Sequence, residues 1–523
     1  MYLNLSDSAK FADIARNLVN GLGYGSTFSF WSINIFELIK TKTFWSPWVP
    51  PVIPYSIAAF FKIFGVGDFA VIATSFFYFI LTLVFVYFLG KRIFNSKLVG
   101  ILSTLTIGFS YDLIHYATNG ASESPFIFEI VAASYFASIK KKWASAVTIL
   151  LLILMYFTRP QAFIYITGIV LYWLLINFKF KKALIFFGII SVVGFLVDYF
   201  VLMSLSGKYF LYSIIGRGVG SSFSQTSVAS DVLRGATIVV EGGISQTLKN
   251  ILYNLYNFYK LLPQIISSYL FGIFVTGLFL KSKNKTESSF KIVSTFIVAF
   301  TFLVTAASIP FFRYLHPVIP LVYIIATGTL VEIISKFEIL NARQIPNPKS
   351  QIQNKRFTII ASTFLILLFG VGQTLGVLIL DSRFEAKTHN VSKPPVYITL
   401  SKILNENTDN NQVVVTNLDT WGSWYGERRT AWFPLEPKQI IDPTTGKIPF
   451  DAIYLTNYLI DDANYYMGND WRMIFNNPND PKKWTCSSCD EIAKEFTLKG
   501  VYKVPASDNY ERLDSSAILL IKK

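Results

Sequence analysis

The chain is poor in cysteine. Cys486 and Cys489 are the only two in 523 residues. Two thiols cannot complete a tetrahedral zinc site without other ligands. Outside the cell, cysteines this close in sequence form a local disulfide more readily than they persist as thiols. The sequence therefore predicts a Cys486–Cys489 disulfide, with two free thiols as the alternative.

Charged residues are also scarce, at 15% of the chain, whereas 52% of the residues are hydrophobic and 16% aromatic. This apolar content exceeds what one soluble core requires and indicates an integral membrane protein. The apolar runs are continuous and lack the period-two alternation of barrel strands, so helices are predicted. Ten spans are expected, at Phe69–Gly90, Leu98–Tyr116, Pro125–Ile139, Trp143–Phe157, Phe163–Ile176, Ala183–Leu205, Leu262–Leu280, Ile292–Ile309, Leu315–Ile334 and Phe357–Leu380.

The basic residues gather in alternate connections between these spans, which places those connections in the cytoplasm. Much of the net charge of +15 is thereby assigned to topology and to anionic membrane lipid, so no nucleic-acid partner is expected. The connections are marked by Lys91, Arg92 and Lys97; Lys140, Lys141 and Lys142; Lys179, Lys181 and Lys182; Lys281, Lys283 and Lys285; and Lys336, Arg343, Lys349, Lys355 and Arg356.

Three regions follow from this topology. They are an outer loop with amphipathic helices at 1–68, a transmembrane domain at 69–381 and an outer domain at 382–523. Ser6 and Asp7 lie near the start with no signal peptide or span ahead of them. Because this segment is expected outside, we predict that a first span is missing from the chain, rather than that the segment crosses without a conventional signal.

The tail differs in composition from the rest of the chain. Short apolar runs at Val413–Val415, Ala452–Leu455 and Ala517–Ile521 alternate with Asn, Asp, Pro and Gly. Such runs predict buried strands in a small α/β domain. A tail of about 140 residues is long enough to bury a core of its own.

Several short motifs lie on the predicted outer face. Residues Asp7–Leu18 form an amphipathic pattern that begins at an acid, and Gly21-Leu22-Gly23-Tyr24 follows it. The other motifs are Pro51-Val52-Ile53-Pro54-Tyr55, Asn119-Gly120-Ala121-Ser122-Glu123, Thr158-Arg159-Pro160, Arg313-Tyr314-Leu315-His316-Pro317 and, in the tail, Gly426-Glu427-Arg428-Arg429.

In this order the motifs resemble the GT-C class of polytopic glycosyltransferases, in particular the family of dolichyl-phosphate-mannose protein mannosyltransferases and bacterial aminoarabinose transferases. Asp7 occupies the acidic position of the family's first outer loop, although Ser8 replaces a common second acid. The resemblance implies an α-helical, GT-C-like membrane protein of about ten spans, the first missing, with a C-terminal α/β domain. It also implies a hexosyl- or pentosyltransferase that uses a polyprenyl-phosphate sugar.

The residue types suit that chemistry. Asp7, Glu123, Arg159 and Arg313 come from four connections, yet the lysine pattern places all four at the outer boundary. An arginine can bind the donor phosphate and disperse the charge that develops on it. A carboxylate can accept the proton of the attacking hydroxyl. Direct displacement without a glycosyl-enzyme intermediate would invert the anomeric centre, with Asp7 as the base and Glu123 as a second catalytic acid.

Each of these residues also has a structural alternative. Asp7 could only cap its helix, Glu123 could be an interfacial acid, and both arginines could extend to the headgroups. Tyr314, His316 and Lys62 are further candidates for substrate binding, although His316 is more often a packing residue and Lys62 a surface lysine. Asp13 is predicted to be a solvated surface acid, and Trp45-Ser46-Pro47-Trp48 to anchor the outer loop in the headgroups. Within the spans, Glu129 and Asp198 need to face protein or water.

Two other functions compete with transfer: a polytopic transporter, and an inactive GT-C-like scaffold. The chain shows no internal repeat and no matched pair of broken helices, features often seen in transporters. Transfer to asparagine is disfavoured, because Trp421-Gly422-Ser423-Trp424-Tyr425-Gly426 lacks the acid of the oligosaccharyltransferase motif. No cofactor is indicated, and no local ligand cluster marks a divalent metal, although the chemistry would allow one. The acceptor can be a protein, a glycolipid or a polysaccharide.

Overall fold

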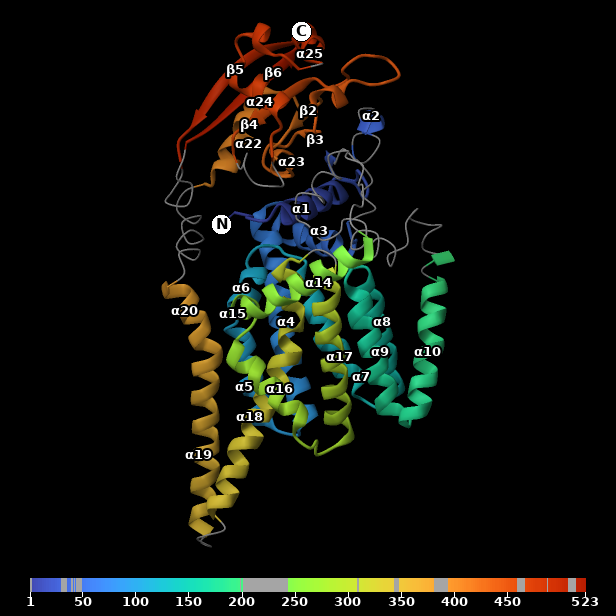
Figure 1. The fold of residues 1–523 in the computed structure, drawn as a ribbon, viewed down its shortest axis with the longest axis vertical. Coiled ribbons are helices and arrows are strands. Elements are labelled where there is room, and N and C mark those ends of the chain that lie inside the picture. Colours follow the sequence, from blue (N-terminus) through green and yellow to red (C-terminus); the bar gives the residue numbers. More distant parts are fainter. Residues whose placement is uncertain are drawn as a thin grey trace.

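The chain folds into a bundle of apolar helices with a sheet domain at one end (Figure 1). Helices α1 (Ser6–Val19) and α3 (Val52–Phe64) lie between the two. The computed structural model describes residues 2–29, 35–38, 41, 43, 49–197, 199–200, 243–307, 310–342, 348–380, 394–458, 466–486, 488–506 and 514–523.

The bundle is built from the apolar segments that the sequence predicts as spans. Its elements are α4 (Asp68–Phe94), α5 (Lys97–Gly108), α6 (Tyr111–Ala117), α7 (Glu123–Ala137), α8 (Lys142–Tyr156), α9 (Ala162–Asn177), α10 (Phe180–Val197), α14 (Gly243–Lys260), α15 (Leu262–Ile265), α16 (Ser268–Phe279), α17 (Lys285–Ala307), the 3-10 turns η2 (Phe312–Tyr314) and η3 (His316–Val318), α18 (Ile319–Ala342), α19 (Pro348–Ile366), the π-helical turn η4 (Leu367–Val371) and α20 (Gly372–Leu380).

Among the described residues, length and hydropathy identify fewer membrane spans than the ten that the sequence predicts. Five stretches in the described part are long and apolar enough to cross a membrane: Asp68–Phe94, Phe180–Val197, Lys285–Ala307, Phe312–Lys336 and Arg356–Gly376. A sixth is formed if α5 and α6, bent by 68° at Phe109 and Ser110, count as one span. The structure therefore confirms a polytopic helical protein, and ten spans stay a prediction.

Basic side chains bind carbonyl groups near the ends of α4 and α17 that lie away from the sheet domain (Figure 1). Arg92 donates to the carbonyl oxygen of Ser138 at 2.8 Å, and Lys285 donates to that of Phe178 at 2.9 Å. Lys291 and Glu287 form a buried ion pair at 2.8 Å. Arg92 and Lys285 thereby satisfy carbonyl groups that α7 and α9 leave unpaired at their C-termini.

The tail forms the predicted α/β domain. Its sheet has six strands in the order β1-β3-β2-β4-β6-β5, with β1, β3, β2 and β4 parallel and β6 and β5 antiparallel to their neighbours. The predicted disulfide joins Cys486 and Cys489. The elements are β1 (Phe28–Ser29), β2 (Val413–Thr416), β3 (Arg429–Trp432), β4 (Ala452–Thr456), β5 (Phe496–Val504), β6 (Ser515–Lys522), α2 (Ile35–Leu38), α22 (Val396–Asn407), α23 (Trp421–Trp424), α24 (Asn469–Asn476), α25 (Cys489–Glu495) and the 3-10 turns η6 (Pro437–Ile440) and η7 (Pro481–Lys483).

The outer loop and the tail share one hydrophobic core. Strand β1 comes from the outer loop and pairs with β3, with Phe28 opposite Thr430. Buried side chains of α1 and α3 pack in the same cluster as the strands of the tail. The tail is therefore completed by a segment that begins more than 350 residues earlier in the chain.

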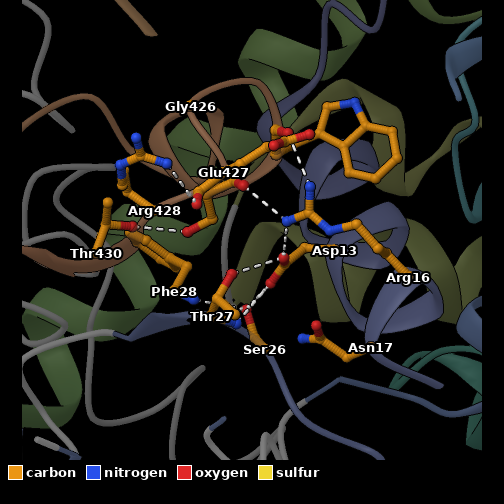
Figure 2. A network of polar contacts seen from close by, with 12 residues as sticks. Asp13, Arg16, Asn17, Ser26, Thr27, Phe28, Gly426, Glu427, Arg428 and Thr430 are labelled. Carbon is orange, nitrogen blue, oxygen red and sulfur yellow. Dashed lines mark hydrogen bonds and ion pairs between the residues drawn. The ribbon is translucent and has the colours of Figure 1, made fainter. Parts of the chain in front are cut away.

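Asp13 is not the solvated acid that the sequence predicts. It is fully buried and accepts hydrogen bonds from the Ser26 hydroxyl at 2.8 Å and from the Thr27 amide at 2.6 Å. Arg16 lies 2.7 Å from it (Figure 2). The prediction of a solvated Asp13 was wrong because the segment after α1 folds back over the face of the helix that carries this residue.

Candidate functional site

Asp7 and Arg313 meet at the end of the bundle that faces the sheet domain. Asp7 is the second residue of α1, and Arg313 lies in η2, between α17 and α18. The Arg313 Nη2 atom is 2.8 Å from Asp7 Oδ2, and the side chains are 34% and 44% exposed. Burial alone would raise the pKa of Asp7, but the charges of Arg313, Lys10 and Arg159 outweigh it, so that pKa is lowered from its usual value of 3.8. Asp7 is therefore ionised at neutral pH.

A second ion pair joins Glu123 and Arg159. Arg159 follows α8 and precedes Pro160, which prevents α8 from continuing. Its Nη1 atom lies 2.6 Å from Glu123 Oε1 and donates to the Ser122 hydroxyl at 2.8 Å. The two side chains are 2% and 7% exposed for Glu123 and Arg159, respectively. This pair is buried, in contrast to the open pair formed by Asp7 and Arg313.

Gly120 brings the turn before Glu123 close to α1 and α4. Its φ of +70° lies in the left-handed region, which favours glycine. A Cβ atom here would come within 2.5 Å of Val71 Cγ1 and 3.4 Å of Ser8 Cβ. The Gly120 amide donates to the Ser75 hydroxyl at 3.1 Å. The close approach explains how the acid after this turn comes to lie near the helix that carries Asp7.

Tyr314 lies against both guanidinium groups. The centre of its ring is 5.4 Å from Cζ of Arg313 and 5.7 Å from Cζ of Arg159. Distances of this order permit attraction between a cation and an aromatic face. The structure therefore gathers Asp7, Glu123, Arg159, Arg313 and Tyr314 at one place, as the sequence analysis expected for the four charged residues.

His316 lies beside this group and is buried. Its Nδ1 atom is hydrogen bonded to the Tyr116 hydroxyl, and its Nε2 atom is 3.9 Å from Asp112 Oδ2. No hydrogen bond to Nε2 is present within the described part of the chain. Sequence analysis did not select Tyr116 or Asp112, which lie inside a predicted span. The break between α5 and α6 places Tyr116 and Asp112 at the end of that span. Ser110, the residue before α6, is a common residue type at a helix start and was the signal in the sequence for this break.

The remaining candidates lie apart from the two ion pairs. Lys62 is exposed near the end of α3 and forms no hydrogen bond or ion pair with them in the described residues. Glu129 lies within α7 and faces protein, where it accepts from the Thr158 hydroxyl at 2.7 Å. Asp198 and the segment 45–48 lie outside the described residues.

The carboxylates of this site are poorly arranged for a metal ion. Asp7 and Glu123 each face a guanidinium, and a positive charge at that position competes with a cation. Within the part of the chain that the structure describes, no group of three or more His, Cys, Asp or Glu residues could hold a metal. The two arginines instead suit an anion.

Comparison with solved structures identifies the fold. The fold is similar to that of the oligosaccharyltransferase from Archaeoglobus fulgidus, with 12% identity, a TM-score of 0.52 and coverage of 90% of this chain and 68% of that one. ArnT from Cupriavidus metallidurans, solved with undecaprenyl phosphate, gives 11% identity, a TM-score of 0.49 and coverage of 89% and 91%. The chain is thus a polytopic membrane protein with the GT-C fold.

Part of the chain also matches a known family. Residues 48–203 match the model of the dolichyl-phosphate-mannose-protein mannosyltransferase family. That segment contains Lys62, Glu123 and Arg159, whereas Asp7 and Arg313 lie outside it. An uncharacterised protein of Aquifex aeolicus (strain VF5) is 27% identical over 214 residues, which are 37% of this chain and 41% of that relative. The chain thus matches less than half the length of that relative.

Proposed function

We propose that this protein is an inverting glycosyltransferase that moves a sugar from a polyprenyl-phosphate donor to an acceptor hydroxyl at the outer face of a membrane. One observation carries the proposal. Four chain segments bring two carboxylate–guanidinium pairs together around Tyr314 at one end of an apolar bundle. A matching family model over residues 48–203 supports a lipid-linked sugar as the donor.

The two arginines would bind the donor phosphate. Arg159 is held by Glu123 and the Ser122 hydroxyl, so its guanidinium is fixed before the donor arrives. Arg313 is half-buried and paired with an open carboxylate, which a phosphate can replace. As the bond between the anomeric carbon and the phosphate oxygen breaks, negative charge accumulates on the leaving phosphate. Two fixed cations stabilise that charge more than they stabilise the ground state.

Asp7 is the better base of the two acids because its side chain is 44% exposed, against 2% for Glu123. A base must contact the hydroxyl whose proton it accepts. Asp7 would take this proton as the acceptor oxygen attacks the anomeric carbon opposite the phosphate, which inverts the centre. Once phosphate occupies Arg313, Asp7 loses its main positive neighbour and becomes more basic. Glu123 would keep Arg159 in place.

The membrane would hold the rest of the donor. Apolar side chains of the bundle are exposed on many helices, for example Phe76 and Phe77 on α4 and Ile292 on α17, so that a prenyl chain can lie against them while the phosphate reaches the arginines. The outer orientation is supported by the basic connections at the far end of the bundle. The acceptor would be a protein, a glycolipid or a polysaccharide.

Transfer assays with purified protein test this proposal. The protein is given a polyprenyl-phosphate sugar that carries its label in the sugar. Lipid, protein and glycan fractions extracted from the outer face of the membrane are added as acceptors. We expect label to move into one fraction and free polyprenyl phosphate to appear in equal amount. Solute counterflow in vesicles without transfer would establish a transporter. Donor binding without transfer to any fraction would favour the inactive scaffold.

A further inference from the structure

We infer that the C-terminal domain positions Asp7 for catalysis through the hydroxyl of Thr420, which holds the start of α1. This inference rests on the proposed function, in which Asp7 is the base. Thr420 contacts neither ion pair of the site in the described residues, so it is a positioning residue. The contacts that support the inference join the tail to Leu3 and Ser6, which precede Asp7.

The residues before Asp7 are bound by three side chains of the tail. The Thr420 hydroxyl donates to the carbonyl oxygen of Ser6 at 2.6 Å, one residue before Asp7. The Leu3 amide donates to the Tyr425 hydroxyl at 2.9 Å, and the Tyr397 hydroxyl donates to the Leu3 carbonyl oxygen at 2.6 Å. Leu3 is fully buried. The backbone that leads into Asp7 is therefore fixed from the side of the sheet domain.

Arg16 fixes the other end of α1 to the same part of the tail. Its Nη2 atom donates to the Ser423 carbonyl oxygen at 2.8 Å, and its Nη1 atom donates to that of Trp424 at 3.1 Å. Its Cζ atom lies 5.1 Å from the centre of the Trp424 ring. Asp13 orients the guanidinium at 2.7 Å (Figure 2). Both ends of α1 are thereby attached to α23 and its flanking residues.

The same segment is also attached to the membrane bundle. Asp68, the first residue of α4, accepts from the Trp424 indole at 2.7 Å and from the Tyr425 hydroxyl at 2.8 Å. Tyr425 therefore contacts both Leu3, ahead of Asp7, and the outer end of α4. Sequence analysis missed Asp68, although an acid at the start of a span after Gly65 and Gly67 was a visible signal. Through these contacts, α23 sets where α1 lies relative to the bundle that carries Arg313.

If the Asp7 carboxylate moved by about 1 Å, the rate of transfer would fall, since displacements of this size can lower a catalytic rate by up to about a hundredfold. We therefore expect Thr420→Val, which removes the hydroxyl at nearly constant volume, to lower kcat about tenfold. The KM for the donor should stay within about twofold, because Arg159 and Arg313 are unchanged. Thr420→Ser keeps the hydroxyl and should restore kcat. Thr416→Val removes another buried hydroxyl of the tail, which bonds Leu418 and not α1, and serves as the control.

A second measurement reports the geometry without any activity. In an Asp7→Cys/Arg313→Cys protein, a short bifunctional methanethiosulfonate should cross-link the two thiols, while Cys486 and Cys489 stay in their disulfide. Thr420→Val should lower the cross-linking yield about threefold, and Thr420→Ser and Thr416→Val should not. An unchanged yield in Thr420→Val, or an equal loss in Thr416→Val, would overturn the inference. If the wild-type protein transfers no sugar while the double-cysteine proteins give the expected yields, only the proposed function is refuted.

Discussion

Replacing Asp7 by asparagine should change turnover and donor binding in opposite directions. Asparagine keeps the size of the side chain but cannot accept a proton as a carboxylate does. It also removes the negative charge 2.8 Å from Arg313, which the donor phosphate must otherwise displace. We therefore expect Asp7→Asn to bind the donor more tightly and to use it more slowly.

The structure sets the size of each effect. Loss of a general base typically lowers a rate by about 10²–10⁴. The ion pair has side chains 34% and 44% exposed, so solvent screens it, and pairs of this kind contribute about 0.2–1 kcal/mol. Removing the competitor should therefore strengthen donor binding by no more than about fivefold, which corresponds to about 1 kcal/mol.

Donor binding and turnover can be measured separately. Titration of a polyprenyl-phosphate sugar into purified protein gives Kd, and single-turnover transfer gives the rate of the chemical step. Asp7→Glu serves as the matched control because it keeps the charge and should keep the Kd near that of the wild type. If Asp7→Asn retains the wild-type rate, or binds the donor more weakly, the assignment of Asp7 as a base that competes for Arg313 is wrong.

Three further outcomes are expected. Arg313→Gln removes the main positive neighbour of Asp7 and so raises the pKa of Asp7. Because the base must be ionised, the acid limb of kcat/KM should move to higher pH than in the wild type, and an unmoved limb would exclude Asp7. Gly120→Ala places a Cβ 2.5 Å from Val71 at φ +70° and should destabilise the protein by at least roughly 1–2 kcal/mol, measured as a lower Tm in detergent; an unchanged Tm would refute the packing argument. Chelation by EDTA should leave transfer unchanged, because Asp7 and Glu123 face arginines; a loss restored by a divalent cation would show that this carboxylate pairing gives way to metal.

Much of the fold was accessible from the sequence because it is local. Continuous apolar runs predicted the bundle helices, and short β-branched runs such as Val413–Val415 predicted strands of the tail. The bend between α5 and α6 was missed because Phe109 and Ser110 interrupt the helix without a proline or a change in hydropathy. Hydropathy does not report such a break, which is why Asp112 and Tyr116 were treated as part of a span.

The sequence predicted which charged residues form the site and that they lie on the same side of the membrane. It did not predict which carboxylate pairs with which arginine. Lysine placement put Asp7 and Arg313 on one face, yet nothing in a single sequence shows that Arg313 pairs with Asp7 and Arg159 with Glu123. Asp13 was misjudged for the same reason. It lies six residues after Asp7, off the helix face of that residue. The partner that buries it is a turn at Ser26 and Thr27, brought back by a strand that joins the tail.

Strand β1 imposes an order on biosynthesis. Leu3 and its partner Tyr425 are 422 residues apart, and translation at about 5–20 residues per second separates their emergence by about 20–80 s. During that interval the first loop has no sheet to join and α1 has no attachment for Arg16. A nascent chain that has inserted the described helices of the bundle therefore still lacks the contacts that hold α1, and Asp7, the proposed base, has no fixed position. Under the proposed function, the site is complete only after α23 and its flanking residues have been synthesised and folded, so a chain that ends before them would not modify acceptors.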